Sequence, residues 1–124
     1  MSLLDNVLVF GKDVLASNET QFNVLDLGKD GRDLAGNRHG AGYLNVHVNS
    51  NIVEDAITLV MYDGDTAENV NNVIGVDVFL SYKNAGEQFS IRLPRTLKRF
   101  VTVRVDNRSA GKIDAFIGAP LADH

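Results

Sequence analysis

The sequence predicts an all-β fold, an antiparallel jelly-roll or β-barrel-like sandwich of about eight strands. Two observations carry this prediction. Apolar residues recur with a period of two along most of the chain, and clusters of Gly, Asn, Asp and Ser separate the apolar runs. A period of two places alternate side chains on one face of a strand, whereas an amphipathic helix needs a period of 3.6. No window of ordinary helix length shows the helical period.

Four segments alternate apolar and polar side chains, as Leu44, Val46 and Val48 do with Asn45 and His47 between them. A strand with this pattern turns one face to a core and the other to solvent. The four segments are residues 44–48, 89–93, 101–105 and 113–117.

Two further strands, residues 56–62 and 76–82, are apolar on both faces. On each of these strands, we expect one apolar face to pack on the core. The apolar side chains of the other face must be shielded from water in some other way. Val60 and Phe79 are the members of the second face that point away from the expected core. We therefore expect these two residues to lie beneath a loop or in an interface between molecules.

An irregular strand is predicted over residues 21–27. Phe22 and Val24 share one face, and then Leu25 and Leu27 share the opposite one. A change of face within a strand requires a bulge or a bend.

A strand over residues 7–10 completes the set. Residues 28–42 contain five glycines and little apolar content, which predicts a long surface loop. The 124 residues have the size of one ordinary domain, so residues 1–124 are expected to form a single sandwich around one core.

Charge is segregated along the chain. Residues 1–82 hold 4 bases and 12 acids, whereas residues 83–112 hold 8 bases and 2 acids. This pattern favours a surface with two electrostatic faces that orients association with a partner. The alternative is that the bases line the solvent side of two neighbouring strands.

Several classes of chemistry find no support in the sequence. There is no cysteine, and therefore no disulfide, thiol nucleophile or cysteine–zinc site. The three histidines, His39, His47 and His124, do not have the spacing of metal ligands. The run Asp63 to Glu68 begins like a calcium loop but has Ile74 where the twelfth-position Glu is required, so a hairpin turn is the expected structure. We expect no enzyme activity, cofactor or metal.

Nucleic-acid and membrane binding are also not expected. The net charge is −4, there is no Trp, and Phe100 alone lies near the basic residues as a base-stacking aromatic. The N-terminal apolar run, Val7 to Phe10, is too short for a signal peptide or a membrane span and follows an acid, Asp5. We therefore expect synthesis in a cytoplasm without export.

Short motifs at the two ends of the chain resemble a known family. Near the N-terminus stand Leu3-Leu4-Asp5 with Leu8 and Phe10, followed by Asn23-Val24-Leu25-Asp26-Leu27-Gly28; near the C-terminus stand Leu93-Pro94, Leu97-Lys98-Arg99-Phe100, the strand Val101–Val105 and Lys112-Ile113-Asp114-Ala115-Phe116-Ile117. In this order they resemble the small cement, or decoration, proteins of tailed-bacteriophage capsids, of the single-domain β-barrel or jelly-roll kind. Residues 49–84 have no counterpart that can be matched residue by residue.

The resemblance implies a structural virion protein, made in the bacterial host cytoplasm. It would bind the major capsid protein on the outside of the capsid and stabilise the shell as a homotrimer. It implies no catalytic residue and transfers no capsid contact. From the two-sided strands and the basic segment we select candidate interface residues: Val60, Phe79, Phe100, Phe116, Arg92, Arg95, Arg99 and Arg104.

A carbohydrate-binding jelly-roll module is the main alternative. Such modules display aromatic platforms for sugar rings, whereas this chain has no Trp and three scattered tyrosines, Tyr43, Tyr62 and Tyr82.

Overall fold

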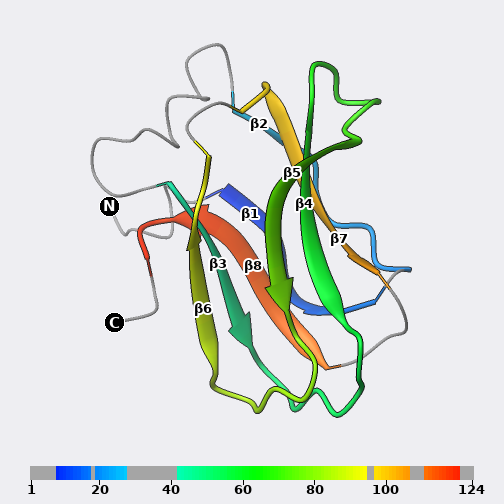
Figure 1. Ribbon diagram of the computed structural model, residues 1–124, viewed down its shortest axis with the longest axis vertical. Helices are drawn as coiled ribbons and strands as arrows, with labels where there is room; N and C mark the ends of the chain where they lie inside the picture. Colours follow the sequence, from blue (N-terminus) through cyan, green and yellow to red (C-terminus); the bar gives the residue numbers. More distant parts are fainter. Residues whose placement is uncertain (1–7, 18, 28–41, 95–96, 107–110, 121–124) are drawn as a thin grey trace.

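The protein is a β-sandwich of two four-stranded antiparallel sheets, which confirms the predicted fold class (Figure 1). The computed structural model describes residues 8–17, 19–27, 42–94, 97–106 and 111–120, and among these there is no helix. The predicted loop over 28–42 therefore lies outside the described residues, except for Gly42. The strands are β1 (Leu8–Leu15), β2 (Leu25–Asp26), β3 (Tyr43–Val48), β4 (Thr58–Gly64), β5 (Asn72–Phe79), β6 (Gln88–Arg92), β7 (Phe100–Asp106) and β8 (Lys112–Gly118).

Sheet A has the order β1-β8-β3-β6, and sheet B has the order β2-β7-β4-β5. The chain changes sheet at every connection except the β4–β5 hairpin. As a result β1 pairs with β8, β2 with β7, β3 with β6 and β4 with β5, in a nested set around that hairpin. Strands from the two ends of the chain are thus direct neighbours.

The core lies between the two sheets and contains the residues that the period of two assigns to it. On β4, Leu59 and Met61 are fully buried, while Val60 points outward and is half-buried. On β5, Val78 is buried and Phe79 is 70% exposed. The two-sided strands therefore have one core face and one outer face, as predicted.

Segment 21–27 departs from the sheet more than predicted, because only Leu25 and Asp26 pair with β7. The backbone N–H of Asn23 donates instead to the carbonyl oxygen of Phe10 in sheet A, at 2.9 Å. The prediction of a strand over all of 21–27 is wrong, because residues 21–24 and Leu27 are not in a strand; Phe22 is buried, while Val24 is 43% exposed. The segment crosses between the sheets there and does not follow one of them.

Strand β5 begins and ends earlier than the predicted 76–82. Its pairing with β4 is regular to Val60 opposite Asp77, and then resumes with Tyr62 opposite Val73. The two extra β5 residues form a bulge around Gly75, whose φ of +78° favours glycine. After the bulge, Val73 pairs with Tyr62 of β4.

Candidate interaction surfaces

The outer face of sheet B brings together four of the eight residues selected from the sequence. Val60 on β4 lies directly opposite Arg104 on β7. Phe79 on β5 lies opposite Thr58, which in turn lies opposite Asp106. The alternation along the three strands places Val60, Phe79, Phe100 and Arg104 on this face.

Arg104 is held over the centre of this face. Its guanidinium lies over the Tyr62 ring, with Cζ 4.5 Å from the ring centroid. One nitrogen, Nη2, donates to the carbonyl oxygen of Val70 at 2.9 Å and to Oδ1 of Asn71 at 3.0 Å. The ion pairs among the described residues are Lys98–Asp65 and Arg99–Asp26, so no described carboxylate lies within 4 Å of the Arg104 guanidinium.

Arg99 differs from Arg104 because its charge already has a carboxylate partner. Its Nε and Nη2 donate to the two carboxylate oxygens of Asp26, at 2.7 and 2.9 Å. These hydrogen bonds, together with the charge of Asp26, raise the pKa of Arg99 above its ordinary value. The pair joins β2 to the segment preceding β7, which gives Arg99 a role within the fold.

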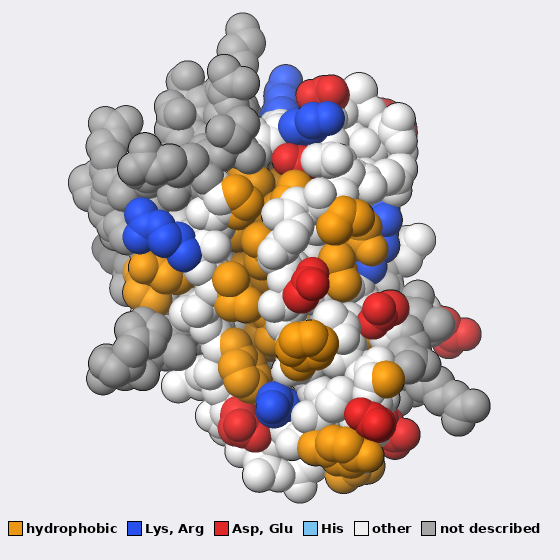
Figure 2. All heavy atoms as spheres, viewed as in Figure 1, with side chains coloured by type: hydrophobic (Ala, Val, Ile, Leu, Met, Phe, Trp, Pro, Cys, Tyr) orange, Lys and Arg blue, Asp and Glu red, His pale blue; other side chains and the backbone are white. Residues whose placement is uncertain are grey.

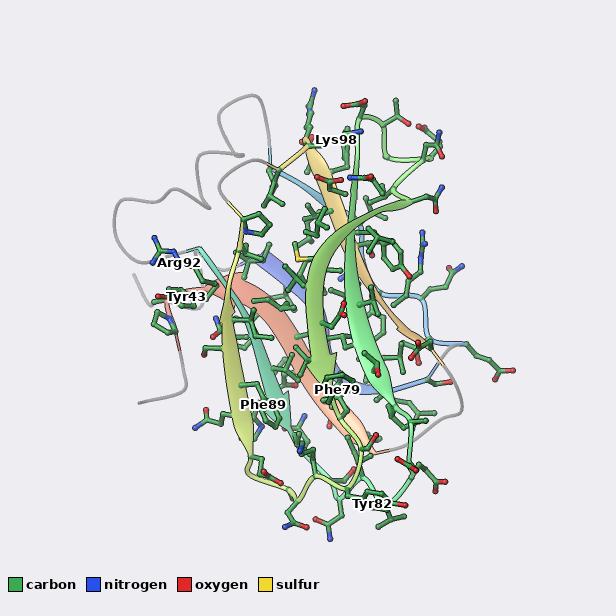
Figure 3. The ribbon with its side chains drawn as sticks, in the orientation of Figure 1. Tyr43, Phe79, Tyr82, Phe89, Arg92 and Lys98 are labelled. Atoms are coloured by element: carbon green, nitrogen blue, oxygen red, sulfur yellow. The ribbon has the colours of Figure 1, made fainter. Side chains whose placement is uncertain are left out.

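The remaining selected residues lie on the other sheet or outside the described residues. Phe116 is half-buried on the outer face of β8, in line with Val9 of β1 and Asn45 of β3. Arg92, at the end of β6, lies over the Tyr43 ring at 5.8 Å from its centroid (Figure 3). Arg95 is outside the described residues. The described bases of 83–112 therefore occur on both sheets, because β6 and β7 belong to different ones.

A second surface lies along the side of the sandwich where β5 and β6 are the edge strands. Figure 2 shows apolar side chains running down this side between the two strands. A hollow there is lined by residues of both strands and by Lys83, whose Nζ lies 5.7 Å from the Phe89 ring centroid. Phe79 and Phe89 flank the hollow from opposite strands (Figure 3). Sequence reasoning missed this surface, since it depends on which two strands are edges.

The run Asp63 to Glu68 begins in the last two residues of β4 and continues into the β4–β5 hairpin loop. Asp63 is 2% exposed, and its Oδ1 and Oδ2 accept hydrogen bonds from the Asn72 side chain at 2.7 Å and from the Lys98 backbone N–H at 2.9 Å. Both carboxylate oxygens of Asp63 are therefore engaged in hydrogen bonds within the fold, to β5 and to the segment before β7. No group of three or more His, Cys, Asp or Glu able to hold a metal occurs within the ranges that the structure describes.

His47 lies on the polar outer face of β3, with Nδ1 2.7 Å from Oδ1 of Asn49. His39 and His124 are outside the described residues. Of the three tyrosines, Tyr43 and Tyr62 each have an arginine over one ring face, while Tyr82 is 65% exposed. These positions do not assemble an aromatic platform of several rings.

No protein-family model matches the chain, and no curated protein sequence matches it significantly. In the described part of the chain there is no helix long and apolar enough to cross a membrane.

Proposed function

We propose that this protein is a structural component of a tailed-phage virion. It binds the major capsid protein on the outside of the shell and stabilises it, and it does so as a homotrimer made in the host cytoplasm. The work of such a protein is binding, so it needs exposed contact surfaces and no cofactor or catalytic group.

The observation that carries the proposal is the composition of the sheet B outer face. Phe79 and Val73 are 70% and 61% exposed, and they share this face with Val60 and with Arg104, which has no described carboxylate partner. Monomeric proteins rarely leave large side chains of this kind gathered on one surface without a use for them. A cationic group among apolar ones is typical of a protein-docking surface.

The fold is consistent with the resemblance that first suggested this function. Among the described motif residues, Leu8 and Phe10 lie in β1, Leu25 and Asp26 in β2, residues 100–105 in β7 and residues 112–117 in β8. β1 pairs with β8, and β2 pairs with β7. The nested pairing of all eight strands also supports a jelly-roll topology, in which one long hairpin is rolled into two sheets.

Co-sedimentation with the heads of the cognate phage tests the function. We expect the wild-type protein to sediment with the heads and to raise the temperature at which they rupture. We also expect a solution mass three times the 13.5 kDa of one chain. Failure to sediment with heads at any salt concentration would contradict the capsid role.

A Val60→Asp variant sharpens this test, because it places a charge at the centre of the sheet B face opposite Arg104. We expect it to lose head binding while keeping its β-type circular dichroism. The control is Leu15→Asp at the end of β1, a residue that is 42% exposed on sheet A, and this variant should still bind. Equal binding by both variants would remove the sheet B face from the contact.

A further inference from the structure

The side of the sandwich between β5 and β6 presents two strand edges. β5 pairs with β4 and β6 pairs with β3, and no described strand pairs with the other edge of either one. Both edges lie on the same side of the molecule, next to one another (Figure 1). Unpaired edges are templates for pairing with another strand, so proteins keep them short, charge them or cover them.

The β5 edge turns backbone groups outward at two residues. The N–H of Leu80 donates to the carbonyl oxygen of Ile57, at 2.8 Å, in line with the β4–β5 ladder. Antiparallel ladders alternate, so the backbone groups of Val78 face β4 and those of Asp77 and Phe79 face the free edge. Both of these residues are exposed.

The β6 edge has the same property. The N–H of Val48 donates to the carbonyl oxygen of Glu87 at 2.9 Å, which fixes the phase of the β3–β6 ladder. The alternation then turns the backbone groups of Gln88 and Arg92 toward the free edge of β6. Both of these residues are exposed as well.

Opposite charges line the hollow between the two edges. Asp77 stands on the β5 edge, and Lys83 lies in the β5–β6 connection with its Nζ 5.7 Å from the Phe89 ring centroid on β6. Both residues line the hollow between the strands. Within one molecule they are not an ion pair, and among the described residues neither has an oppositely charged partner within 4 Å. Exposed Phe79 and half-buried Phe89 supply the apolar contact area between them.

We propose that the occupant of this side is a second copy of the chain, with the β5 edge of one copy pairing with the β6 edge of the next. In this arrangement Asp77 faces Lys83 of the partner subunit, whereas pairing of two β5 edges would bring two Asp77 carboxylates together. When each copy pairs its β5 edge with one neighbour and its β6 edge with another, the contact is heterologous, and a ring forms if the rotation closes. The inference rests on the self-association part of the proposed function and is independent of capsid binding.

Engineered disulfides test the pairing directly, since the chain has no cysteine of its own. Asp77→Cys or Phe79→Cys on β5 is co-expressed, with a different tag, with Gln88→Cys or Arg92→Cys on β6. We expect at least one mixed combination to form an intersubunit disulfide under mild oxidation, and to do so several-fold more efficiently than any β5 variant with itself. β5–β5 disulfides as the main product would overturn the proposal.

A charge exchange provides the second measurement. Asp77→Lys should weaken self-association at least tenfold at low salt, and adding Lys83→Asp to it should restore most of the loss. Glu19→Lys, at an exposed acid on the segment beside β7, is the matched control and should change nothing.

The outcomes separate this inference from the proposed function. A trimeric mass without any mixed disulfide and without rescue by the charge exchange overturns the edge pairing and leaves the trimer standing. A wild-type protein that stays monomeric at high concentration overturns both.

Discussion

At the scale of single residues, the described side chains differ sharply in whether they serve the fold or remain available at the surface. Asp63 lies near the end of β4 and Asp65 lies two positions further on, in the hairpin loop. Asp63 is 2% exposed with both oxygens hydrogen-bonded, while the Asp65 side chain is 81% exposed. The period of two explains part of this contrast, because residue 63 continues the inward series of Leu59 and Met61 on β4.

Replacing Asp63 should therefore be costly. In Asp63→Ala the Asn72 side-chain amide and the Lys98 N–H lose the carboxylate oxygens that accept their hydrogen bonds. Hydrogen bonds to charged groups contribute about 1.5–3 kcal/mol each. We expect the free energy of unfolding to fall by about 3 kcal/mol in urea titration. Asp65→Ala, which removes an exposed ion pair with Lys98 at 3.8 Å, should change it by less than about 1 kcal/mol. Equal losses in the two variants would contradict the role given to Asp63.

At the scale of elements, the β4–β5 hairpin is the centre of the nested strand pairs and depends on two glycines for different reasons. A Cβ on Gly64 would lie 2.2 Å from the backbone oxygen of Asn69, so the loop passes too close for any side chain. A Cβ on Gly75 would meet nothing within 4 Å, and only its positive φ disfavours other residues.

These two causes predict different losses of stability. Gly64→Ala must displace backbone atoms and should lower the free energy of unfolding by about 3 kcal/mol or more. Gly75→Ala pays only for the left-handed conformation, about 1–2 kcal/mol. Thermal unfolding followed by circular dichroism measures the stability of the two variants. A larger loss of stability in Gly75→Ala than in Gly64→Ala would contradict this explanation of the two glycines.

At the scale of the whole molecule, the topology distributes the basic residues of 83–112 over both sheets. Arg92 is at the end of β6 in sheet A, and Arg104 is on β7 in sheet B. The charge segregation along the sequence therefore does not become a single basic face among the described residues. Arg99, paired with Asp26, contributes to holding β2 against β7.

The two arginines without a described carboxylate partner should have separable effects on capsid binding. We expect Arg104→Glu to weaken head binding several-fold at low salt, and the difference from wild type to shrink as salt rises, because exposed charges act mainly on the association rate. Arg92→Glu should have a smaller effect, since it lies away from the sheet B face. Measuring head binding against salt concentration checks both, and a stronger loss for Arg92→Glu would move the contact to sheet A.

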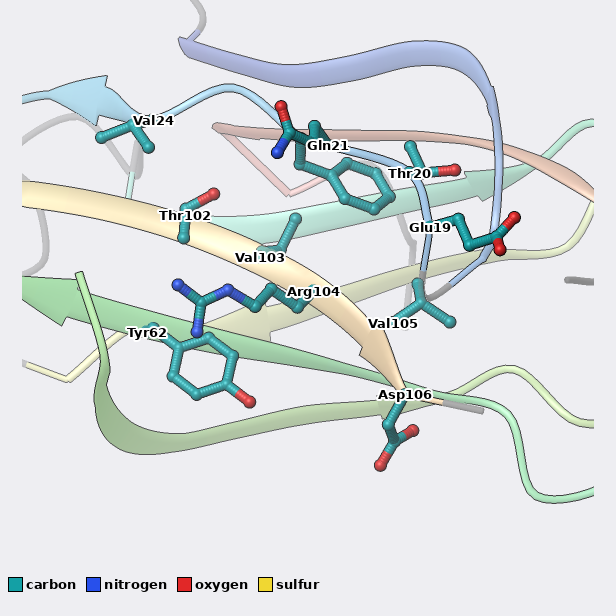
Figure 4. A pocket seen from close by; sticks show the side chains of 11 residues that line it. Glu19, Thr20, Gln21, Val24, Tyr62, Thr102, Val103, Arg104, Val105 and Asp106 are labelled. Atoms are coloured by element: carbon teal, nitrogen blue, oxygen red, sulfur yellow. The ribbon is translucent and has the colours of Figure 1, made fainter. Parts of the chain in front are cut away.

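A groove beside β7 is a weaker candidate for a binding site than the two surfaces described above. It is lined by segment 19–24 and by Tyr62, Thr102 and Arg104 (Figure 4). Thr102 is only 4% exposed and its hydroxyl already donates to the carbonyl oxygen of Asn23 at 3.0 Å. The polar groups at its base are therefore engaged within the fold.

The all-β class, most of the strands and most of the core side chains could be predicted from the amino-acid sequence alone. Leu59, Met61 and Val78 are buried and Phe79 is exposed, as the alternation requires, because side-chain direction in a strand is a local property with a period of two. Which strands are neighbours and which are edges could not be predicted in this way, since strand pairing joins residues that are far apart in sequence. Arg99 binds Asp26, which is 73 positions away in the sequence, and β5 and β6 are the edge strands on one side of the sandwich. No pattern within a short stretch of sequence indicates either of these facts.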